Sequence, residues 1–116
     1  MEQKLSIVIP AYNEEATIHL ILDKVREVKL DGNLSKEVIV INDASSDDTK
    51  GALERYQQQY ADFPITYFEH ERNQGKGAAL HTGIRIAKGD YLIIQDADLE
   101  YDPEEYNLLL KPIVNG

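Results

Sequence analysis

The 116-residue sequence contains no cysteine and no tryptophan. The absence of cysteine excludes a disulfide framework, a cysteine-ligated zinc site and a thiol nucleophile. No uninterrupted apolar run reaches the length of a signal peptide core or a membrane span. We therefore expect a soluble, cytoplasmic chain without a transmembrane segment, and we expect any membrane association of the full-length protein to be peripheral, at the cytoplasmic face.

Basic residues are also scarce. The sequence has 12 lysines and arginines against 21 aspartates and glutamates, which gives a formal net charge of -9. This balance would repel a phosphate backbone and no basic stripe compensates for it, so we do not expect nucleic acid as a partner. The acidity suits carboxylates that bind a divalent cation, although a solvated acidic surface is the more common explanation.

Short apolar segments alternate with amphipathic ones along the chain, without an internal repeat. Four segments rich in β-branched or aromatic residues predict strands at residues 5–9, 38–41, 65–68 and 91–94. Their nearly continuous apolar character is typical of strands buried on both faces. The pattern predicts an α/β fold with an open, mostly parallel sheet flanked by helices, in one domain or part of one.

Two helices are predicted before the third strand. Apolar residues recur at helical spacing over residues 18–28, which predicts a helix that faces the core, with Asn13 as its N-cap. A second helix is predicted to begin at Ser45 or Ser46, because a hydroxyl there can cap the first turn.

Two further helices are predicted after the third strand. One follows Gly77 and turns Leu80, Ile84 and Ala87 inward. The other begins at Asp102, where a capping carboxylate precedes a proline at the first helical position.

All candidate functional motifs follow predicted strands. Parallel strands joined by right-handed helical crossovers bring their carboxyl ends to one edge of the sheet. The motifs lie at residues 10–14, 42–46, 72–77 and 96–98. A strand order of 3-2-1-4 would place a ligand crevice between the first and fourth strands, with Tyr12 facing Asp98 across it.

The segment Asp96-Ala97-Asp98 carries the strongest chemical signal. Residues i and i+2 of an extended segment point to the same side, so the two carboxylates can converge on one hard cation, for which magnesium or manganese is favoured over zinc. Glu100 can supply a third oxygen, or it can be an ordinary surface residue. An isolated pair of this kind is more often solvated, but its position after a buried strand favours the metal site.

The loops after the first two strands offer groups suited to a nucleoside. Pro10 fixes the backbone, and Tyr12 presents an aromatic face and a hydroxyl that suit a nucleobase. Asp43 can cap a helix or accept hydrogen bonds from a base imide or a ribose hydroxyl. We favour the ligand, since the serines that follow can cap. Glu14 can interact with the helix dipole or reach a ribose, and residue type does not separate these.

The segment Gly75-Lys76-Gly77 resembles phosphate-binding chemistry, because glycines permit close backbone approach and the ammonium offsets diphosphate charge. The spacing fits neither a P-loop nor a dinucleotide-binding turn. We assign no function to the scattered histidines His19, His70 and His81.

Four segments together resemble the family-2 inverting glycosyltransferases of the GT-A fold. They lie at residues 8–15, 40–47, 73–79 and 96–100, and the resemblance covers nearly the whole chain. The most similar branch resembles dolichol-phosphate mannose synthase and the bacterial polyprenyl-phosphate glycosyltransferases. The resemblance implies inverting transfer of a hexose from a nucleotide-diphosphate sugar, of the GDP-mannose or UDP-glucose type, to a polyprenyl or dolichyl phosphate.

The resemblance also implies roles for individual residues in the first two motifs. Pro10, Ala11, Tyr12 and Glu14 would border the nucleobase and ribose, and Asp43 would bind the base.

In the last two motifs, Lys76 would lie near the nucleotide, and Asp96 and Ala97 would contact the nucleotide-sugar. Asp96, Asp98 and Glu100 would bind Mg²⁺ or Mn²⁺. Glu100 differs from the glutamine often found at this position in the mannose synthases, although a carboxylate can still bind a metal.

The resemblance places residues 1–116 in the N-terminal, nucleotide-sugar-binding part of a single catalytic domain. The acceptor side and any general base would lie elsewhere, so we expect this chain to bind a nucleotide without efficient turnover. A sugar-nucleotide nucleotidyltransferase is an alternative, but its glycine-rich, arginine-containing turn after the first strand is replaced by residues 10–13. A response-regulator domain would need paired acids there, where this chain has Tyr12 and Asn13.

Overall fold

The computed structural model describes residues 3–32, 34–96 and 106. Strands and helices alternate in the order β1 (Gln3–Ala11), α1 (Ile18–Glu27), β2 (Leu34–Asn42), α2 (Thr49–Gln59), β3 (Ile65–Glu69), α3 (Lys76–Ile86) and β4 (Tyr91–Ile94). Each of the four predicted strands lies within an observed one.

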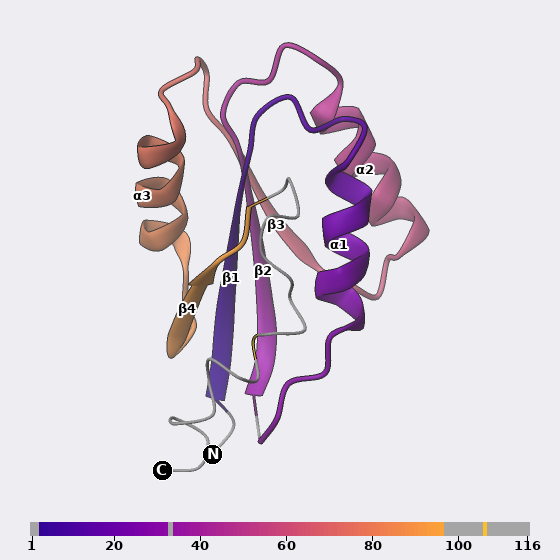
Figure 1. Cartoon of the computed structure of the whole chain (residues 1–116), viewed down its shortest axis with the longest axis vertical. Helices are drawn as coiled ribbons and strands as arrows, with labels where there is room; N and C mark the ends of the chain where they lie inside the picture. The colour runs from indigo at the N-terminus through magenta and orange to yellow at the C-terminus, as the bar shows by residue number, and fades with distance from the viewer. Residues whose placement is uncertain (1–2, 33, 97–105, 107–116) are drawn as a thin grey trace.

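The strands form one sheet in the order β3-β2-β1-β4, and every neighbouring pair is parallel. β1 pairs with β2 over nine positions, from Gln3 opposite Leu34 to Ala11 opposite Asn42. Figure 1 shows α1 and α2 on one face of the sheet and α3 on the other. The open parallel α/β fold predicted from the sequence is confirmed, together with its strand order.

The central strands are buried on both faces, which explains their continuous apolar sequences. In β1, Leu5, Ile7 and Ile9 pack with the residues of α1 and α2, whereas Val8 packs with Ala79 of α3. β2 alternates in the same way. Each fully buried side chain of this size contributes roughly 1.5–3 kcal/mol relative to an exposed one, so the two apolar layers hold the helices against the sheet.

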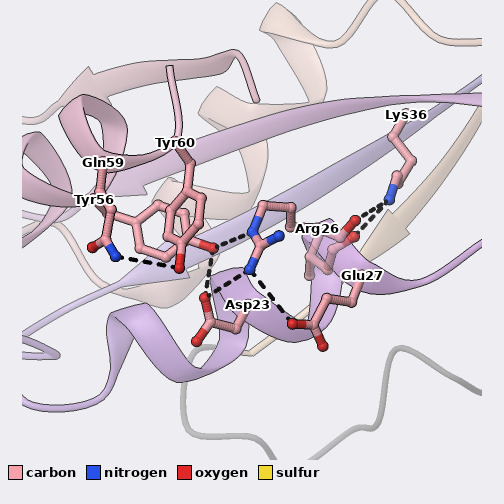
Figure 2. A network of polar contacts seen from close by, with 8 residues as sticks. Asp23, Arg26, Glu27, Lys36, Tyr56, Gln59 and Tyr60 are labelled. Carbon is pink, nitrogen blue, oxygen red and sulfur yellow. Dashed lines mark hydrogen bonds and ion pairs between the residues drawn. The ribbon is translucent and has the colours of Figure 1, made fainter. Parts of the chain in front are cut away.

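The carboxyl end of α1 is closed by a lysine of the neighbouring strand. The Lys36 ammonium donates hydrogen bonds to the carbonyl oxygens of Val25, Arg26 and Val28, at 2.8, 3.0 and 2.7 Å. Figure 2 shows Lys36 pointing toward the end of this helix. These carbonyls belong to the last turn of α1 and to its C-cap, Val28, where the helix itself leaves carbonyl groups without intrahelical donors. The charge also lies at the negative end of the helix dipole, which stabilises the helix further.

A polar network joins α1 to α2. The Tyr56 hydroxyl donates to Asp23 at 2.8 Å and accepts from Arg26 Nε at 3.1 Å, and the Arg26 guanidinium lies 4.1 Å from the centre of the Tyr60 ring (Figure 2). Burial, together with the Asp23 carboxylate, raises the pKa of the Tyr56 hydroxyl. Tyr56 therefore remains a neutral donor, and the network fixes the relative position of the two helices.

α2 begins at Thr49, so the predicted start at Ser45 or Ser46 is wrong. The N-cap is Asp48, whose carboxylate accepts a hydrogen bond from the Gly51 N–H at 3.2 Å. The serine hydroxyls do not cap because they bind residues of the loop after β1 and the end of β2.

α3 begins at Lys76, and its packed face agrees with the sequence prediction only in part: Ala87 packs against the sheet as predicted, whereas the fully buried positions were not predicted. Its buried residues are Ala79, Thr82 and Gly83. Ile84, predicted to point inward, is 50% exposed. The helix approaches β1 so closely at Gly83 that a β-carbon there would collide with the side chain of Val8. The fully packed positions of this helix are therefore small residues, and Ile86 packs beside them while partly buried.

This close approach makes Gly83 a sensitive position. We expect Gly83→Ala to lower the free energy of unfolding by roughly 1–3 kcal/mol, because Val8 or the helix must move to accept the methyl group. Gly77→Ala in the same helix is the matched control, since nothing lies within 4 Å of its added β-carbon. Urea denaturation of both variants tests this, and equal stabilities would contradict the packing of α3 on β1.

The predicted fourth helix lies outside the described residues, except for Tyr106. This residue is helical and fully buried, and its hydroxyl donates a hydrogen bond to Gln95 Oε1 at 2.8 Å. Among the helices in the described part of the chain, none has both the length and the apolar character that crossing a membrane requires.

Candidate nucleotide site

A cavity of about 400 Å³ lies at the carboxyl edge of the sheet. It is lined by Pro10, Ala11, Tyr12, Glu14, Asp43, Asn73, Gly75, Lys76, Ala79 and Asp96. Seven of the eight residues predicted to bind the nucleotide-sugar are therefore found together, brought from the ends of all four strands. The eighth, Ala97, and the predicted metal ligands Asp98 and Glu100 lie outside the described residues.

The loops after β1 and β2 are tied together by one asparagine, and we call this contact between Asn13 and residues 45–47 the loop clasp. Asn13 Oδ1 accepts hydrogen bonds from the Ser46 N–H and hydroxyl, at 2.7 and 3.1 Å, and from the Asp47 N–H at 3.3 Å. Asn13 has a positive φ of 56°, which asparagine tolerates better than most residues. Its predicted role as N-cap of the first helix is wrong, because α1 begins at Ile18 and its N-cap is Thr17.

The loop clasp flanks two of the cavity residues. Tyr12 is 48% exposed, so its ring is available at the cavity. Glu14 is fixed by its neighbours: its N–H donates to Thr49 Oγ1 at 2.9 Å, its carbonyl accepts from the Ile18 N–H at 2.8 Å, and its carboxylate accepts from the Thr17 hydroxyl at 2.6 Å. The sequence left open whether Glu14 interacts with the helix start or reaches a ribose, and the structure shows contact with the start of α1.

Asp43 is a buried acceptor at the end of β2, and its side chain does not cap α2. Its Oδ1 accepts from His70 Nδ1 at 2.8 Å and from the Gln74 N–H at 2.9 Å, and its Oδ2 accepts from the Gly75 N–H at 2.8 Å. Burial acts to raise the pKa of Asp43, but these hydrogen bonds outweigh it and lower the pKa below the ordinary value. The carboxyl group is therefore ionised at neutral pH.

His70 is a site residue that the sequence reading missed. It is 5% exposed, and its ring lies between Asp43 and Thr82, with Nε2 at 2.8 Å from Thr82 Oγ1. Its partners are distant in sequence, so no local pattern marks it. The available signal was its position directly after the third strand, at the edge where the other motifs meet.

The turn before α3 places a cation at the cavity. Gly75 has φ 95° and ψ 162°, a conformation suited to glycine, and it leads directly into Lys76, the first residue of the helix. The Lys76 ammonium lies 2.5 Å from Oδ1 of Asp96, which follows β4, so these two cavity residues are in contact. A diphosphate entering here would meet the positive end of a helix and an ammonium group.

The metal site predicted from the sequence is represented by Asp96 alone, because its other two ligands lie outside the described residues. Within residues 3–32, 34–96 and 106, no three histidine or carboxylate side chains converge on a metal-sized position. Asp96 is partly buried, with 25% of its side chain exposed, and its oxygens are of the hard type that Mg²⁺ and Mn²⁺ prefer. The residue present fits such an ion, and the full ligand set remains a prediction.

Residues 6–116 match the family model described as glycosyl transferase family 2. The chain belongs to this family. The match spans all four motif segments, so the resemblance inferred from their order is confirmed.

Curated relatives in the family act on lipid phosphates, as their names state. The chain is 33% identical over 101 residues to the dolichyl-phosphate β-glucosyltransferase of Mus musculus, covering 83% of this chain and 31% of that protein. It is 31% identical over 113 residues to the dolichol-phosphate mannosyltransferase of Pyrococcus furiosus, covering 97% of this chain and 31% of that protein. The chain therefore spans about a third of the length of these relatives.

Solved structures of the family have the same fold. The mannosyltransferase PcManGT of Pyrobaculum calidifontis, in complex with GDP-mannose and Mn²⁺, superposes with a TM-score of 0.77 at 32% identity, covering 90% of this chain and 30% of that one. Glucosyl-3-phosphoglycerate synthase of Mycobacterium tuberculosis, in complex with Mn²⁺, UDP and glucosyl-3-phosphoglycerate, superposes with a TM-score of 0.75 at 28% identity. That match covers 98% of this chain and 40% of the synthase chain. The expected GT-A fold is confirmed.

Proposed function

We propose that this chain carries the donor site of a glycosyltransferase that moves a hexose, with inversion, from a nucleotide-diphosphate sugar to a polyprenyl phosphate. The observation that carries the proposal is the cavity at the carboxyl edge of the sheet, where an exposed aromatic ring, an ionised carboxylate and an ammonium group lie together. The lipid-phosphate acceptor is inferred from the names of the relatives.

The nucleoside part of the donor would bind between the loops after β1 and β2. The exposed Tyr12 ring offers a face for stacking on a base. The Asp43 carboxylate accepts three hydrogen bonds from the protein, which leaves about one acceptor position on its two oxygens. An acceptor of this kind suits the imide N–H of uracil or guanine, which adenine lacks.

The diphosphate would lie beside the start of α3. There the Lys76 ammonium and the positive end of the helix stabilise the negative charge that develops on the departing diphosphate. Mg²⁺ or Mn²⁺, held by Asp96 with Asp98 and Glu100, would supply further stabilisation of that charge as a Lewis acid. A single displacement at the anomeric carbon inverts its configuration, and an anionic phosphate acceptor needs no general base.

Donor binding and sugar transfer are separate parts of the proposal. Binding groups are present in this chain, whereas about two thirds of each curated relative has no counterpart in it. Correct alignment of donor and acceptor supplies roughly 7–11 kcal/mol of barrier reduction, and it requires groups that hold the acceptor as well as the donor. We therefore propose sugar transfer for the whole protein and donor binding for this chain. Assays with radiolabelled GDP-mannose or UDP-glucose and polyprenyl phosphate measure the transfer directly.

The binding step is testable by calorimetry with UDP, GDP and ADP, each with and without Mn²⁺. We expect UDP or GDP to bind at least about tenfold more tightly than ADP, because only the first two can donate an imide N–H to the Asp43 carboxylate. We also expect Mn²⁺ to increase the affinity. Equal, metal-independent binding of all three nucleotides, or no binding, would contradict the proposed donor site.

A further inference from the structure

A chain of buried hydrogen bonds runs behind the cavity, from the end of β2 to the middle of α3. Asp43 and His70 have side-chain exposures of only 5% and 4%. The His70 ring bridges Asp43 Oδ1 and Thr82 Oγ1, at 2.8 Å on each side, and Thr82 Oγ1 lies 3.0 Å from the Ala78 carbonyl oxygen. His70 does not line the cavity of about 400 Å³, so it acts on that site through its partners.

The backbone of His70 is fixed independently of its ring. Its N–H donates to the Asn42 carbonyl at 2.9 Å, which extends the pairing of β3 with β2 by one residue. The edge of the ring also meets Phe68, with ring centres 5.9 Å apart in a T-shaped arrangement. The ring is therefore held from three directions and has a defined orientation.

The ring supplies one of the three hydrogen bonds that hold the Asp43 carboxylate. An ionised carboxylate only accepts hydrogen bonds, so His70 Nδ1 carries the proton of the bond between them. The same carboxylate receives the N–H groups of Gln74 and Gly75, the two residues before Lys76. A rotation of the Asp43 side chain would release these amides, and the turn that leads into α3 would lose its anchor.

We propose that His70 is a positioning residue of the donor site, which sets the orientation of the Asp43 carboxylate and thereby of the Gln74–Gly75 turn without touching the nucleotide. The expected effects on nucleotide affinity rest on the proposed function, whereas the orientation of the Asp43 carboxylate does not. The proposal assigns to His70 a larger effect on the nucleoside part of the ligand, which Asp43 serves directly, than on a bare diphosphate, which is affected only through the turn before Lys76.

Two conservative variants separate the two sides of the ring. In His70→Asn the amide nitrogen takes approximately the place of Nδ1, so the bond to Asp43 is kept. In His70→Gln the amide nitrogen takes approximately the place of Nε2, so the bond to Thr82 is kept and the bond to Asp43 is lost. His81→Gln, the same substitution at an exposed histidine of α3, is the matched control.

The affinities for UDP, GDP and inorganic pyrophosphate are to be measured at a fixed Mn²⁺ concentration. If Asp43 is no longer held in place, the nucleobase loses its hydrogen bond to the Asp43 carboxylate, and loss of a hydrogen bond to a charged group weakens binding by about tenfold or more. We expect this loss for UDP or GDP in His70→Gln, and a smaller loss for pyrophosphate in the same variant because the Gln74–Gly75 turn adjoins Lys76. In His70→Asn and His81→Gln we expect a change below about threefold for every ligand. Equal losses in both His70 variants, or equal losses for nucleotide and pyrophosphate, would overturn the inference.

A ligand-free measurement distinguishes failure of this inference from failure of the proposed function. In amide NMR spectra, the Gln74 and Gly75 signals are expected to shift and to lose protection from hydrogen exchange in His70→Gln, and to stay near the wild-type positions in His70→Asn. If the wild-type protein binds neither UDP nor GDP, the proposed function fails while this pattern still supports the positioning role. Unchanged Gln74 and Gly75 signals in His70→Gln would overturn the positioning role, whichever nucleotide binds.

Discussion

Replacement of Asp43 by alanine is expected to lower the free energy of unfolding by about 3 kcal/mol and to abolish detectable binding of UDP and GDP. The physical reason is that three donors, His70 Nδ1 and the N–H groups of Gln74 and Gly75, lose their common acceptor at a buried position. Urea denaturation measures the stability change, and calorimetry measures the binding. Asp62→Ala, at an exposed aspartate after α2, is the control and is expected to change neither quantity appreciably.

The pH dependence of this effect follows from the pKa of Asp43. Because its pKa is lower in the folded protein than in the unfolded chain, its stabilising effect is fully present above the unfolded value. That effect disappears as the pH falls through the lower, folded pKa. The stability difference between the wild-type protein and Asp43→Asn is therefore expected to be larger at about pH 5 than below about pH 3. A difference that grows on acidification would contradict the hydrogen-bonded, ionised state of Asp43.

Asp96→Asn is expected to remove the Mn²⁺-dependent part of UDP or GDP affinity, a loss of at least about tenfold. The amide keeps the size of the side chain but lacks the negative charge that a hard cation requires. Without Mn²⁺ the nucleotide affinity of the variant is expected to rise slightly, because the substitution removes one carboxylate that competes with the diphosphate for the Lys76 ammonium. Calorimetric titrations with and without Mn²⁺ measure both effects.

Two further variants make this result specific. Asp90→Asn alters a carboxylate before β4, at the opposite end of the strand from Asp96, and is expected to leave the Mn²⁺ dependence unchanged. Lys76→Met is expected to weaken binding both with and without Mn²⁺, since the proposed site places the lysine ammonium beside the diphosphate. The same Mn²⁺ dependence in Asp96→Asn as in the wild-type protein would exclude Asp96 as a metal ligand.

The sheet was predictable because its strands are buried on both faces and their apolar residues are contiguous in sequence. Their parallel order then placed the motifs at one edge, and the family resemblance added roles for individual residues there. The start of α2 was not predictable from its serines, since Ser45 and Ser46 have competing partners in the loop after β1. A capping residue is recognised by type, whereas its partner is decided by the tertiary fold.

The fully buried positions of α3 and the position of His70 were missed for related reasons. Hydrophobic periodicity pointed to Ile84, whereas Gly83 allows the helix backbone itself to approach Val8, and a missing side chain leaves no hydrophobic signal. His70 is defined by contacts with Asp43 and Thr82, which lie 27 and 12 residues away in the sequence. Both features depend on distances that only the folded chain has.

The loop clasp at Asn13 determines when the flanking loops become ordered. Because the hydrogen bonds of the clasp join protein groups only, part of the conformational entropy of the loops after β1 and β2 is lost when the chain folds and not when the cavity is filled. Fixing a backbone residue opposes association by about 1–2 kcal/mol when it happens on binding, so the clasp removes that penalty for each residue it holds in place. A ligand of this cavity therefore meets walls that are already in position, and its affinity reports its own contacts more directly than the ordering of the protein.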